Sequence, residues 1–402
     1  ADPVPVLPEG AEKCYAPEVA FDRQGRLYYL FLGLQGVGNS PMGAFLTSSV
    51  DRGRTWAPPH MVLGPENYMV RMVIDPTMGS AGRIHLVWLK TASRPGLGGL
   101  PAGSNPLVAA HSDDGGRTFT EPVQISDPTR PRSVAPTVAL GPDHAVHVAY
   151  FDLRDDAVDY QGLEGAVWPG EWSVVVTSST DGGEQWKPGV VVDDGLVPPG
   201  RVMLIFTMPP PALAADRSGR LFAGWWDARN GDPDVFLARS PDGGRSWEAP
   251  VRLNDDPEGS GADQYLLRLS VAANGRVDAV FLDRRNDPRN LSNDAYLTYS
   301  TDNGRTFSAP ETVVTDEYFP HANVRAALAG DDFWVTWDDP RTEAGSIGLV
   351  RIGPDGRPNP EANPSLSGRT SAVAVGEGGP VPAWVSDAGV EVRPLADLEA
   401  AT

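Results

Sequence analysis

Short apolar segments separated by polar turns repeat along the chain. In each repeat an apolar run, such as residues 269–272, is followed by a turn and by a second run rich in Val, Leu and Trp, such as residues 277–282. Runs of this length bounded by Gly, Asn and Asp predict β-strands joined by tight turns. The turns align at Gly25, Gly82, His144, Gly219, Gly275, Gly330 and Gly379. The pattern therefore predicts an all-β protein built from seven similar units.

A second pattern, Ser-x-Asp-x-Gly-x-Thr-Trp, recurs about every sixty residues, as expected of a structural repeat. Its five copies occupy residues 49–56, 112–119, 179–186, 240–247 and 300–307. In some copies Ser or Gln replaces the Thr, or Phe replaces the Trp. Asp and Gly favour a tight turn, and the Asp carboxylate can accept neighbouring backbone N–H groups. The final aromatic residue can anchor the turn in the core. The motif predicts a hairpin clasp.

These motifs are Asp boxes, and the chain resembles the sialidase-like, BNR-repeat β-propeller superfamily over most of its length. The resemblance implies a propeller whose boxes lie away from the ligand face and have no catalytic role. Seven units of about 57 residues fit seven four-stranded antiparallel blades. Residues 4–7 are expected to supply the last strand of the last blade and so hide the sheet edges. The alternative is the six-bladed propeller of sialidases. We expect a single domain, residues 1–402.

Composition narrows the classes of partner. The formal net charge is −20, which disfavours a nucleic-acid partner because phosphates would be repelled. Cys14 is the single cysteine, so an internal disulfide and a cysteine-based zinc site are excluded. No apolar run is long enough to form a membrane-spanning helix. Because the numbering begins at Ala1, we expect a mature secreted, cell-surface or periplasmic chain. We also expect a monomer.

Polar residues early in the innermost strands are candidates for ligand binding, because these strands begin at the ligand face of a propeller. At one aligned position the strands carry Glu18, Arg71, Thr137, Ala212, Arg268, Asn323 and Ala372. Arg325 lies two residues after Asn323 and therefore on the same side of its strand. Aromatic residues that can stack on sugar rings precede this position at Tyr15, Tyr68 and Tyr265, with His321 close to the equivalent place in unit six.

Three of these residues, Arg71, Arg268 and Arg325, are suited to a carboxylate-bearing ligand, because each guanidinium offers a bidentate fork. One hypothesis is β-elimination from an acidic polysaccharide, with His321 or Tyr265 as the base beside Arg268. Seven-bladed propellers include such lyases. A different interpretation is that the arginines only neutralise a carboxylate-rich channel.

Resemblance to sialidases implies another set of roles. Tyr265 with Glu18 or Glu317 would form the nucleophile pair, and Asp152 or Asp155 would be the acid. The chain departs from sialidases at Glu18, which stands in the unit where they carry an arginine-containing segment. Hydrolysis and elimination therefore both remain open as reactions.

Other acidic residues have structural explanations. The sequence Asp-x-Arg follows the second strand at residues 152–154, 227–229 and 283–285, and again at 339–341. Since one active site needs each role once, this recurrence predicts ion pairs between blades.

Oxygen ligands suited to calcium are grouped at Asp152, Asp155, Asp156 and Asp159, and at Asp227, Asp232 and Asp234. A solvated acidic loop is the alternative, and no other cofactor is expected.

Long loops at residues 91–106, 151–172 and 193–207 are predicted on the ligand face, where specificity usually resides. Trp168, in the middle loop, is a candidate sugar platform. We therefore predict a secreted Asp-box propeller that engages an acidic carbohydrate as a sialidase-like glycoside hydrolase or a polysaccharide lyase. The alternative is a non-catalytic propeller that binds a glycan or protein or supports an assembly.

Overall fold

The structure is a computed structural model of the chain. It describes residues 6–36, 40–51, 53–79, 82–90, 105–130, 132–154, 170–197, 209–314, 322–329, 332–339, 346–353, 358–359, 366–367, 369–376, 379–386 and 389–392. Every regular element within these residues is a β-strand. The same residues contain no helix long and apolar enough to cross a membrane. The prediction of an all-β fold is confirmed.

The described strands form seven antiparallel sheets, numbered here in chain order. Sheet one contains β1 (Lys13–Phe21), β2 (Leu27–Gln35), β3 (Ser40–Ser49) and β4 (His60–Leu63), and sheet two contains β5 (Asn67–Asp75), β6 (Arg83–Lys90), β7 (Leu107–Ser112) and β8 (Val123–Gln124). Sheet three contains β9 (Ser133–Leu140), β10 (Val146–Asp152), β11 (Trp172–Ser179) and β12 (Val190–Leu196). Sheet four contains β13 (Ala212–Ala215), β14 (Leu221–Asp227), β15 (Asp234–Ser240) and β16 (Val251–Arg252).

Sheet five contains β17 (Gln264–Val271), β18 (Val277–Asp283), β19 (Asp294–Ser300) and β20 (Glu311–Val314). Sheet six contains β21 (Ala322–Ala329), β22 (Asp332–Asp339), β23 (Ser346–Ile352), β24 (Pro358–Asn359) and β25 (Leu366–Ser367). Sheet seven contains β26 (Arg369–Gly376), β27 (Gly379–Ser386) and β28 (Gly389–Val392). Consecutive strands pair with one another in each sheet, except that β25 pairs with β23, and this order is the meander expected of propeller blades.

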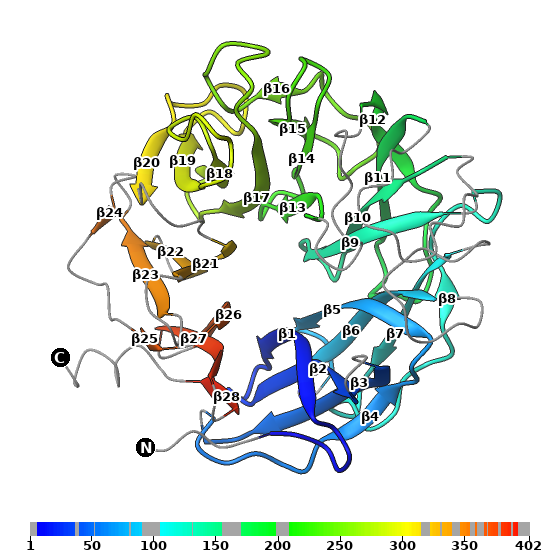
Figure 1. Ribbon diagram of the computed structural model, residues 1–402. Coiled ribbons are helices and arrows are strands. Elements are labelled where there is room, and N and C mark those ends of the chain that lie inside the picture. Colours follow the sequence, from blue (N-terminus) through cyan, green and yellow to red (C-terminus); the bar gives the residue numbers. More distant parts are fainter. Residues whose placement is uncertain are drawn as a thin grey trace.

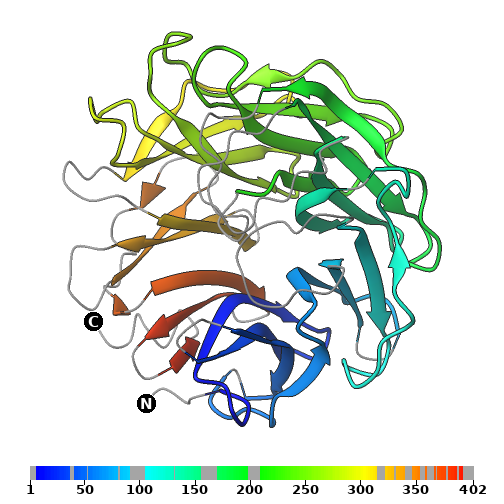
Figure 2. The same cartoon turned by 45° about the vertical axis from the view of Figure 1, so that its right-hand side comes forward.

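The sheets are arranged radially around a common centre (Figure 1). Each sheet turns its first strand inward, and this strand contacts the first strand of the next sheet; β26 in turn contacts β1. The second view shows the same ring obliquely (Figure 2). Because neighbouring strands are antiparallel, the innermost strands begin on one face, called here the entry face. The Asp boxes lie between third and fourth strands and therefore on the opposite face, called here the box face.

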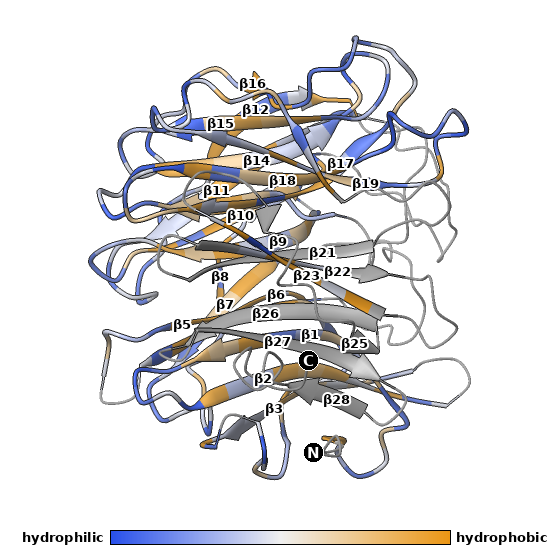
Figure 3. Ribbon diagram, turned by 90° about the vertical axis from the view of Figure 1, so that its left-hand side faces the viewer, coloured by the Kyte–Doolittle hydropathy of each residue, from blue (hydrophilic) through white to orange (hydrophobic). Residues whose placement is uncertain are grey.

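Second strands are sandwiched between neighbouring sheets, and this explains their apolar sequences. All residues of β10, β14 and β18 are buried, including the large side chains of Trp225 and Phe281. Figure 3 shows apolar residues concentrated in the strands and polar residues in the loops. The core is therefore a series of layers between blades, and burial of this apolar area is the main stabilising term.

The predicted closure by residues 4–7 falls partly outside the described residues, which begin at Val6. Val6 is buried and belongs to the apolar cluster of Tyr29, Phe31 and Phe45 in the first sheet. Within the described part of the chain, β28 pairs with β27. The closing strand stays a prediction.

The Asp boxes form the predicted clasps. In the first box Asp51 Oδ1 accepts the backbone N–H of Thr55 at 2.8 Å, and Asp51 Oδ2 accepts the Thr55 hydroxyl at 2.6 Å. These bonds lower the pKa of Asp51 to about 2. Ser49 Oγ accepts the N–H of Gly53 at 2.8 Å, and Trp56 packs against the buried cluster of the first sheet. The carboxylate thus holds a turn.

Two of the four Asp-x-Arg sequences form the predicted ion pairs between blades. Arg229 binds Asp227 at 2.7 Å within its own sheet and Asp193 of the preceding sheet at 2.5 Å. Arg285 likewise binds its own Asp283 at 2.7 Å and Asp255, which follows the last strand of sheet four, at 2.5 Å. Each arginine therefore ties one sheet to the sheet before it. In sheet three Arg154 instead binds Glu171 and Asp194 of its own sheet, and Arg341 lies outside the described residues.

Candidate functional site

A β-bulge near the start of the innermost strands shapes the centre of the entry face. The register between first and second strands shifts at equivalent places, for example between Tyr15 and Glu18 and between Tyr68 and Arg71. The bulge residues Ala16, Met69, Ala135 and Leu266 have positive φ angles of 53°, 50°, 52° and 56°. Each such angle costs a non-glycine residue about 1–2 kcal/mol. Bulges re-aim the following side chains and are common beside binding sites.

The strand register defines which residues share one place around the ring. The first residues paired again after the bulge, together with Ala212 in sheet four, are Glu18, Arg71, Thr137, Ala212, Arg268, Arg325 and Ala372. In sheet six this position belongs to Arg325, and the predicted alignment of Asn323 was wrong. The alignment counted residues back from the turn between the first and second strands. In sheet six this turn, from Ala329 to Asp332, is shorter than the turn from Val271 to Val277 in sheet five, so the count reached two residues too far back.

Glu18 and Arg71 form an ion pair across the first two sheets. Arg71 Nη1 donates to Glu18 Oε1 at 2.8 Å, and Arg71 Nε donates to the carbonyl of Pro136 in sheet three at 2.9 Å. About a fifth to a quarter of each charged side chain is exposed, 22% for Arg71 and 24% for Glu18. The pair therefore joins three innermost strands while remaining accessible from solvent.

Tyr265 is held by a polar cluster at the start of β17. Its hydroxyl donates to Asn293 Oδ1 at 2.7 Å and accepts from Arg284 Nη2 at 2.8 Å. The Arg284 guanidinium lies over the Tyr265 ring, 4.9 Å from its centroid, and forms an ion pair with Asp263 at 3.1 Å. Burial raises the pKa of Tyr265, and the Arg284 cation opposes this rise. The phenol is therefore fixed in position and connected to a cation.

Sequence reasoning missed Arg284, Asn293 and Asp263. A signal was present, because Arg284 follows Asp283 directly and adds a second arginine to that Asp-x-Arg sequence. Asp263 lies only two residues before Tyr265, but no local pattern connects Asn293 to Tyr265, since these two residues meet only when β17, β18 and β19 form one sheet.

The other predicted binding residues differ in exposure. Tyr15 is 38% exposed, whereas Tyr68 packs against the main apolar cluster, and burial raises the pKa of Tyr68 well above its usual value. Arg268 Nη1 donates to the carbonyl of Leu267 at 3.0 Å. The backbone places Arg325 at the same register position as Arg268. Predicted residues that lie outside the described residues are Asp155, Trp168, Glu317 and His321.

Asp152 ends β10 at the entry face. Its Oδ1 accepts the backbone N–H of Arg154 at 2.7 Å, and its Oδ2 lies 3.8 Å from Arg130 Nε. Burial raises the pKa of Asp152. The carboxyl lines a cavity between sheets two and three.

The acidic residues considered for calcium are engaged by protein donors. Asp227 binds Arg229, and Asp234 binds Arg252 and the side chain of Asn254. Asp232 accepts the backbone N–H groups of Gly259 and Gly261. Among the residues that the structure describes, no group of three His, Cys, Asp or Glu is placed to hold a metal ion. The other predicted group includes Asp155, Asp156 and Asp159, which lie outside the described residues.

Several solved structures similar to this chain are carbohydrate-active enzymes. An ulvan lyase is similar with a TM-score of 0.61 at 11% sequence identity, with 100% of both chains covered, and its complex with a glucuronic acid and sulfated rhamnose unit scores 0.58 at 12% identity with the same coverage. A Hadza microbial sialidase scores 0.53 at 15% identity, with 97% of this chain and 67% of that chain covered. An α-L-arabinanase from Penicillium chrysogenum scores 0.54 at 16% identity, with 83% and 95% covered.

No protein-family model matches the sequence, and no curated protein matches it. At these identities the similarity establishes the fold and not the activity. The fold is shared by glycoside hydrolases and polysaccharide lyases. The chain therefore has the β-propeller fold of these sialidase and ulvan lyase structures.

Proposed function

We propose that the protein cleaves a carboxylate-bearing polysaccharide by β-elimination at the centre of the entry face. The observation that carries the proposal is the pairing of Tyr265 with Arg284, at the start of the strand that also carries Arg268. A phenol that bonds to a cation can exchange a proton with a substrate, and nearby arginines can bind the substrate carboxylate. Similarity in fold to an ulvan lyase over the full length of both chains supports this choice.

The reaction removes the proton from the ring carbon that bears the uronate carboxylate. The electron pair of that C–H bond forms a C=C bond to the neighbouring carbon, and the glycosidic C–O bond to that carbon breaks. The leaving oxygen takes up a proton. An arginine beside the carboxylate stabilises the negative charge that develops during this step. We assign proton transfer to Tyr265 and carboxylate binding to Arg268, with Arg325 at the same register position.

Elimination fits the polar contacts better than sialidase-like hydrolysis. A tyrosine nucleophile needs a carboxylate partner that accepts its proton. In the described part of the chain, Tyr265 bonds to an amide and a guanidinium, while Glu18 bonds to Arg71. A non-catalytic binding propeller is the second candidate, because the Glu18 and Arg71 charges already satisfy each other.

The experiment compares wild type with Tyr265→Phe and Arg268→Ala on a panel of ulvan, alginate, pectate, hyaluronan and chromogenic sialosides. Tyr299→Phe, in the same sheet, is the matched control for loss of a tyrosine hydroxyl. Ultraviolet absorbance of the unsaturated product should appear with a uronate polymer, and Tyr265→Phe should lower its rate at least about a hundredfold. Sialoside hydrolysis would contradict elimination. Saturable binding without turnover on any substrate would establish the binding propeller instead.

We also propose that the seven sheets are seven blades of a single domain, residues 1–402, closed by the N-terminal segment. Contact between β26 and β1, and burial of Val6 against the first sheet, support this arrangement. Deleting residues 1–7 should lower the midpoint of thermal unfolding, whereas deleting the same number of C-terminal residues should change it less. Equal effects would contradict closure by the N-terminus. Export and a monomeric state are further proposals, and light scattering on the purified chain checks the second.

A further inference from the structure

A cavity of about 400 Å3 lies between sheets two and three, away from the residues assigned to elimination. Its walls are the segment that connects β8 to β9 on one side and strands β10 to β12 on the other. None of Glu18, Arg71, Tyr265 or Arg268 lines it. Val191, at its outer wall, is 50% exposed, so the cavity opens to solvent. Its volume is within the range typical of small-molecule sites.

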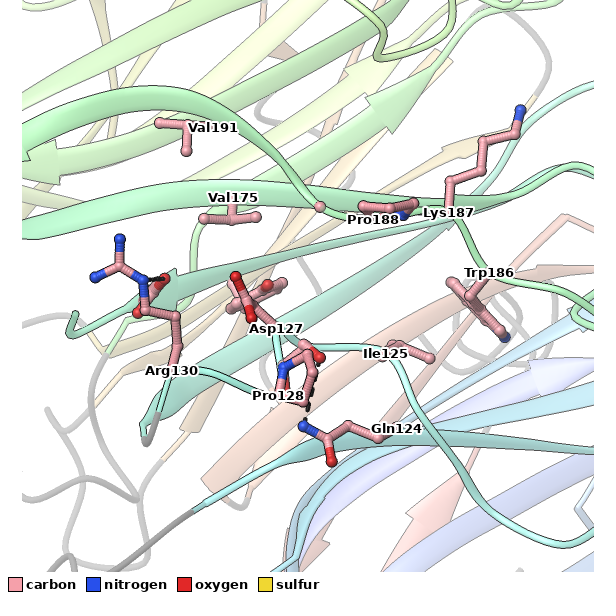
Figure 4. A pocket seen from close by; sticks show the side chains of 14 residues that line it. Gln124, Ile125, Asp127, Pro128, Arg130, Val175, Trp186, Lys187, Pro188 and Val191 are labelled. Carbon is pink, nitrogen blue, oxygen red and sulfur yellow. Dashed lines mark hydrogen bonds and ion pairs between the residues drawn. The ribbon is translucent and has the colours of Figure 1, made fainter. Parts of the chain in front are cut away.

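The lining combines an apolar floor with charged groups of both signs. Val175, Pro188 and Val191 contribute apolar surface, while Arg130 lies at one end of the group and Lys187 at the other (Figure 4). Asp127 and Asp152 add two carboxyl groups to these two cations, so the formal charge of the lining is balanced. A balanced lining does not select for an ionic ligand. It offers hydrogen-bond donors and acceptors beside apolar surface.

The contacts of Asp152 differ from those of its equivalents in other sheets. In sheets four and five the arginine two residues later binds its own aspartate, as Arg229 binds Asp227. In sheet three Arg154 instead binds Glu171 at 2.9 Å and also Asp194. Asp152, which lines the cavity, is paired instead with Arg130, whose Nε lies 3.8 Å from Asp152 Oδ2. Both partners of this ion pair line the cavity, and its distance is longer than the 2.7 Å between Arg229 and Asp227.

Burial raises the pKa of Asp152, and only 7% of the residue is exposed. An ionised carboxylate offers about four acceptor positions, so Asp152 can accept hydrogen bonds from a ligand in addition to its contacts with Arg154 and Arg130. The indole of Trp186 also lines the cavity, at the same end as Lys187 (Figure 4). A carboxyl and a guanidinium close to each other can bind adjacent hydroxyl groups, and an aromatic or apolar surface can pack against the C–H face of a sugar ring.

We propose that this cavity is a second carbohydrate-binding site, specific for uncharged sugar residues. Asp152 accepts hydrogen bonds from ligand hydroxyls, Arg130 donates to them, and the apolar surface from Val175 to Trp186 supports the ring faces. Because the cavity extends from the entry face at Asp152 to the box face at Trp186, it suits an extended oligosaccharide. The site works independently of the elimination reaction, whose residues lie elsewhere.

The test uses titration calorimetry of the full chain with maltohexaose, cellohexaose, xylohexaose and mannohexaose. At least one of these neutral oligosaccharides should bind saturably, and Asp152→Asn should weaken that binding about tenfold or more. Val191→Trp, which fills the outer wall, should weaken it as well. The matched control is Asp143→Asn, an exposed aspartate in the turn that precedes β10. Thermal unfolding of each variant establishes that the fold is retained.

Absence of saturable binding by all four oligosaccharides would overturn the proposal. Binding that both Asp152→Asn and Val191→Trp leave unchanged would overturn it as well. If Arg268→Ala abolishes binding and Asp152→Asn keeps it, the sugar binds at the centre of the entry face. That result would equally refute the second site. Loss of polysaccharide cleavage in Tyr265→Phe, with oligosaccharide binding retained, distinguishes the two proposals.

Discussion

Buried histidines make the stability of this propeller depend on pH, and His85 allows the effect to be calculated. His85 lies in β6, and 2% of the residue is exposed. Burial, together with the nearby His111 and Arg83, lowers its pKa to about 4, and Asp75 and Asp113 act in the opposite direction. An exposed histidine in the unfolded chain has a pKa of about 6.5. The unfolded chain therefore binds this proton more readily, and stability is lost as the pH falls from about 6.5 towards 4.

The size of the effect follows from these two pKa values. Between about pH 7.5 and pH 5, the difference in proton binding lowers the free energy of unfolding by about 2 kcal/mol for this one residue. His147, whose pKa burial also lowers to about 4, adds a similar amount. His85→Phe keeps an aromatic ring and removes the titration. We expect the wild type to lose about 2 kcal/mol more than His85→Phe over this pH interval.

Urea unfolding followed by tryptophan fluorescence at both pH values measures the difference. His60→Phe is the matched control, because the ring of His60 is exposed at the outer strand β4. The informative quantity is the change with pH within each protein, so a constant effect of the substitution on stability cancels. An identical pH dependence in wild type and His85→Phe would refute the reasoning, since it would mean that His85 takes up no additional proton on unfolding.

Three further predictions test the packing and the clasps. Arg285→Ala should lower the free energy of unfolding by about 3–5 kcal/mol, measured by urea denaturation, because it leaves the fully buried Asp283 without its cation; a loss below about 1 kcal/mol would contradict the role of this ion pair. Phe281→Ala should cost about 3–5 kcal/mol in the same assay because it opens a cavity between blades; the alternative result is an unchanged midpoint. Thr55→Val should raise the pKa of Asp51 in an NMR titration, since it removes the 2.6 Å hydrogen bond from the Thr55 hydroxyl, and an unchanged pKa would exclude that bond.

The fold could be predicted because its determinants are local. Each Asp box contains its own donors and acceptor, so the turn of residues 49–56 can be recognised without knowing what it packs against. The continuous apolar runs of β10 and β18 result from burial on both faces. Ion pairs between blades could also be anticipated, because an Asp-x-Arg sequence recurs once in several units.

The candidate site could be predicted only in part. The sequence identified Tyr265 and the arginines at one register position, but it placed Asn323 where Arg325 belongs, since the length of a turn is not visible in an apolar pattern. It also left Asp152 with three alternative roles, as a member of a repeated ion pair, as a sialidase-like acid and as a calcium ligand. The structure distinguishes Asp152 from the equivalent aspartates, because the Arg154 guanidinium binds Glu171 and not Asp152.

The sequence by itself determined the turns, the strands and the repetition of one unit, because these depend on residues that are close in the chain. Only the tertiary structure decided which side chains meet at the centre and between blades. Tyr265 contacts Asn293 and Arg284 across three strands of one sheet. Arg71, in sheet two, binds Glu18 of sheet one and the carbonyl of Pro136 in sheet three. Such contacts depend on the register of each strand and on the rotation between neighbouring sheets, and both are set by packing of the whole ring.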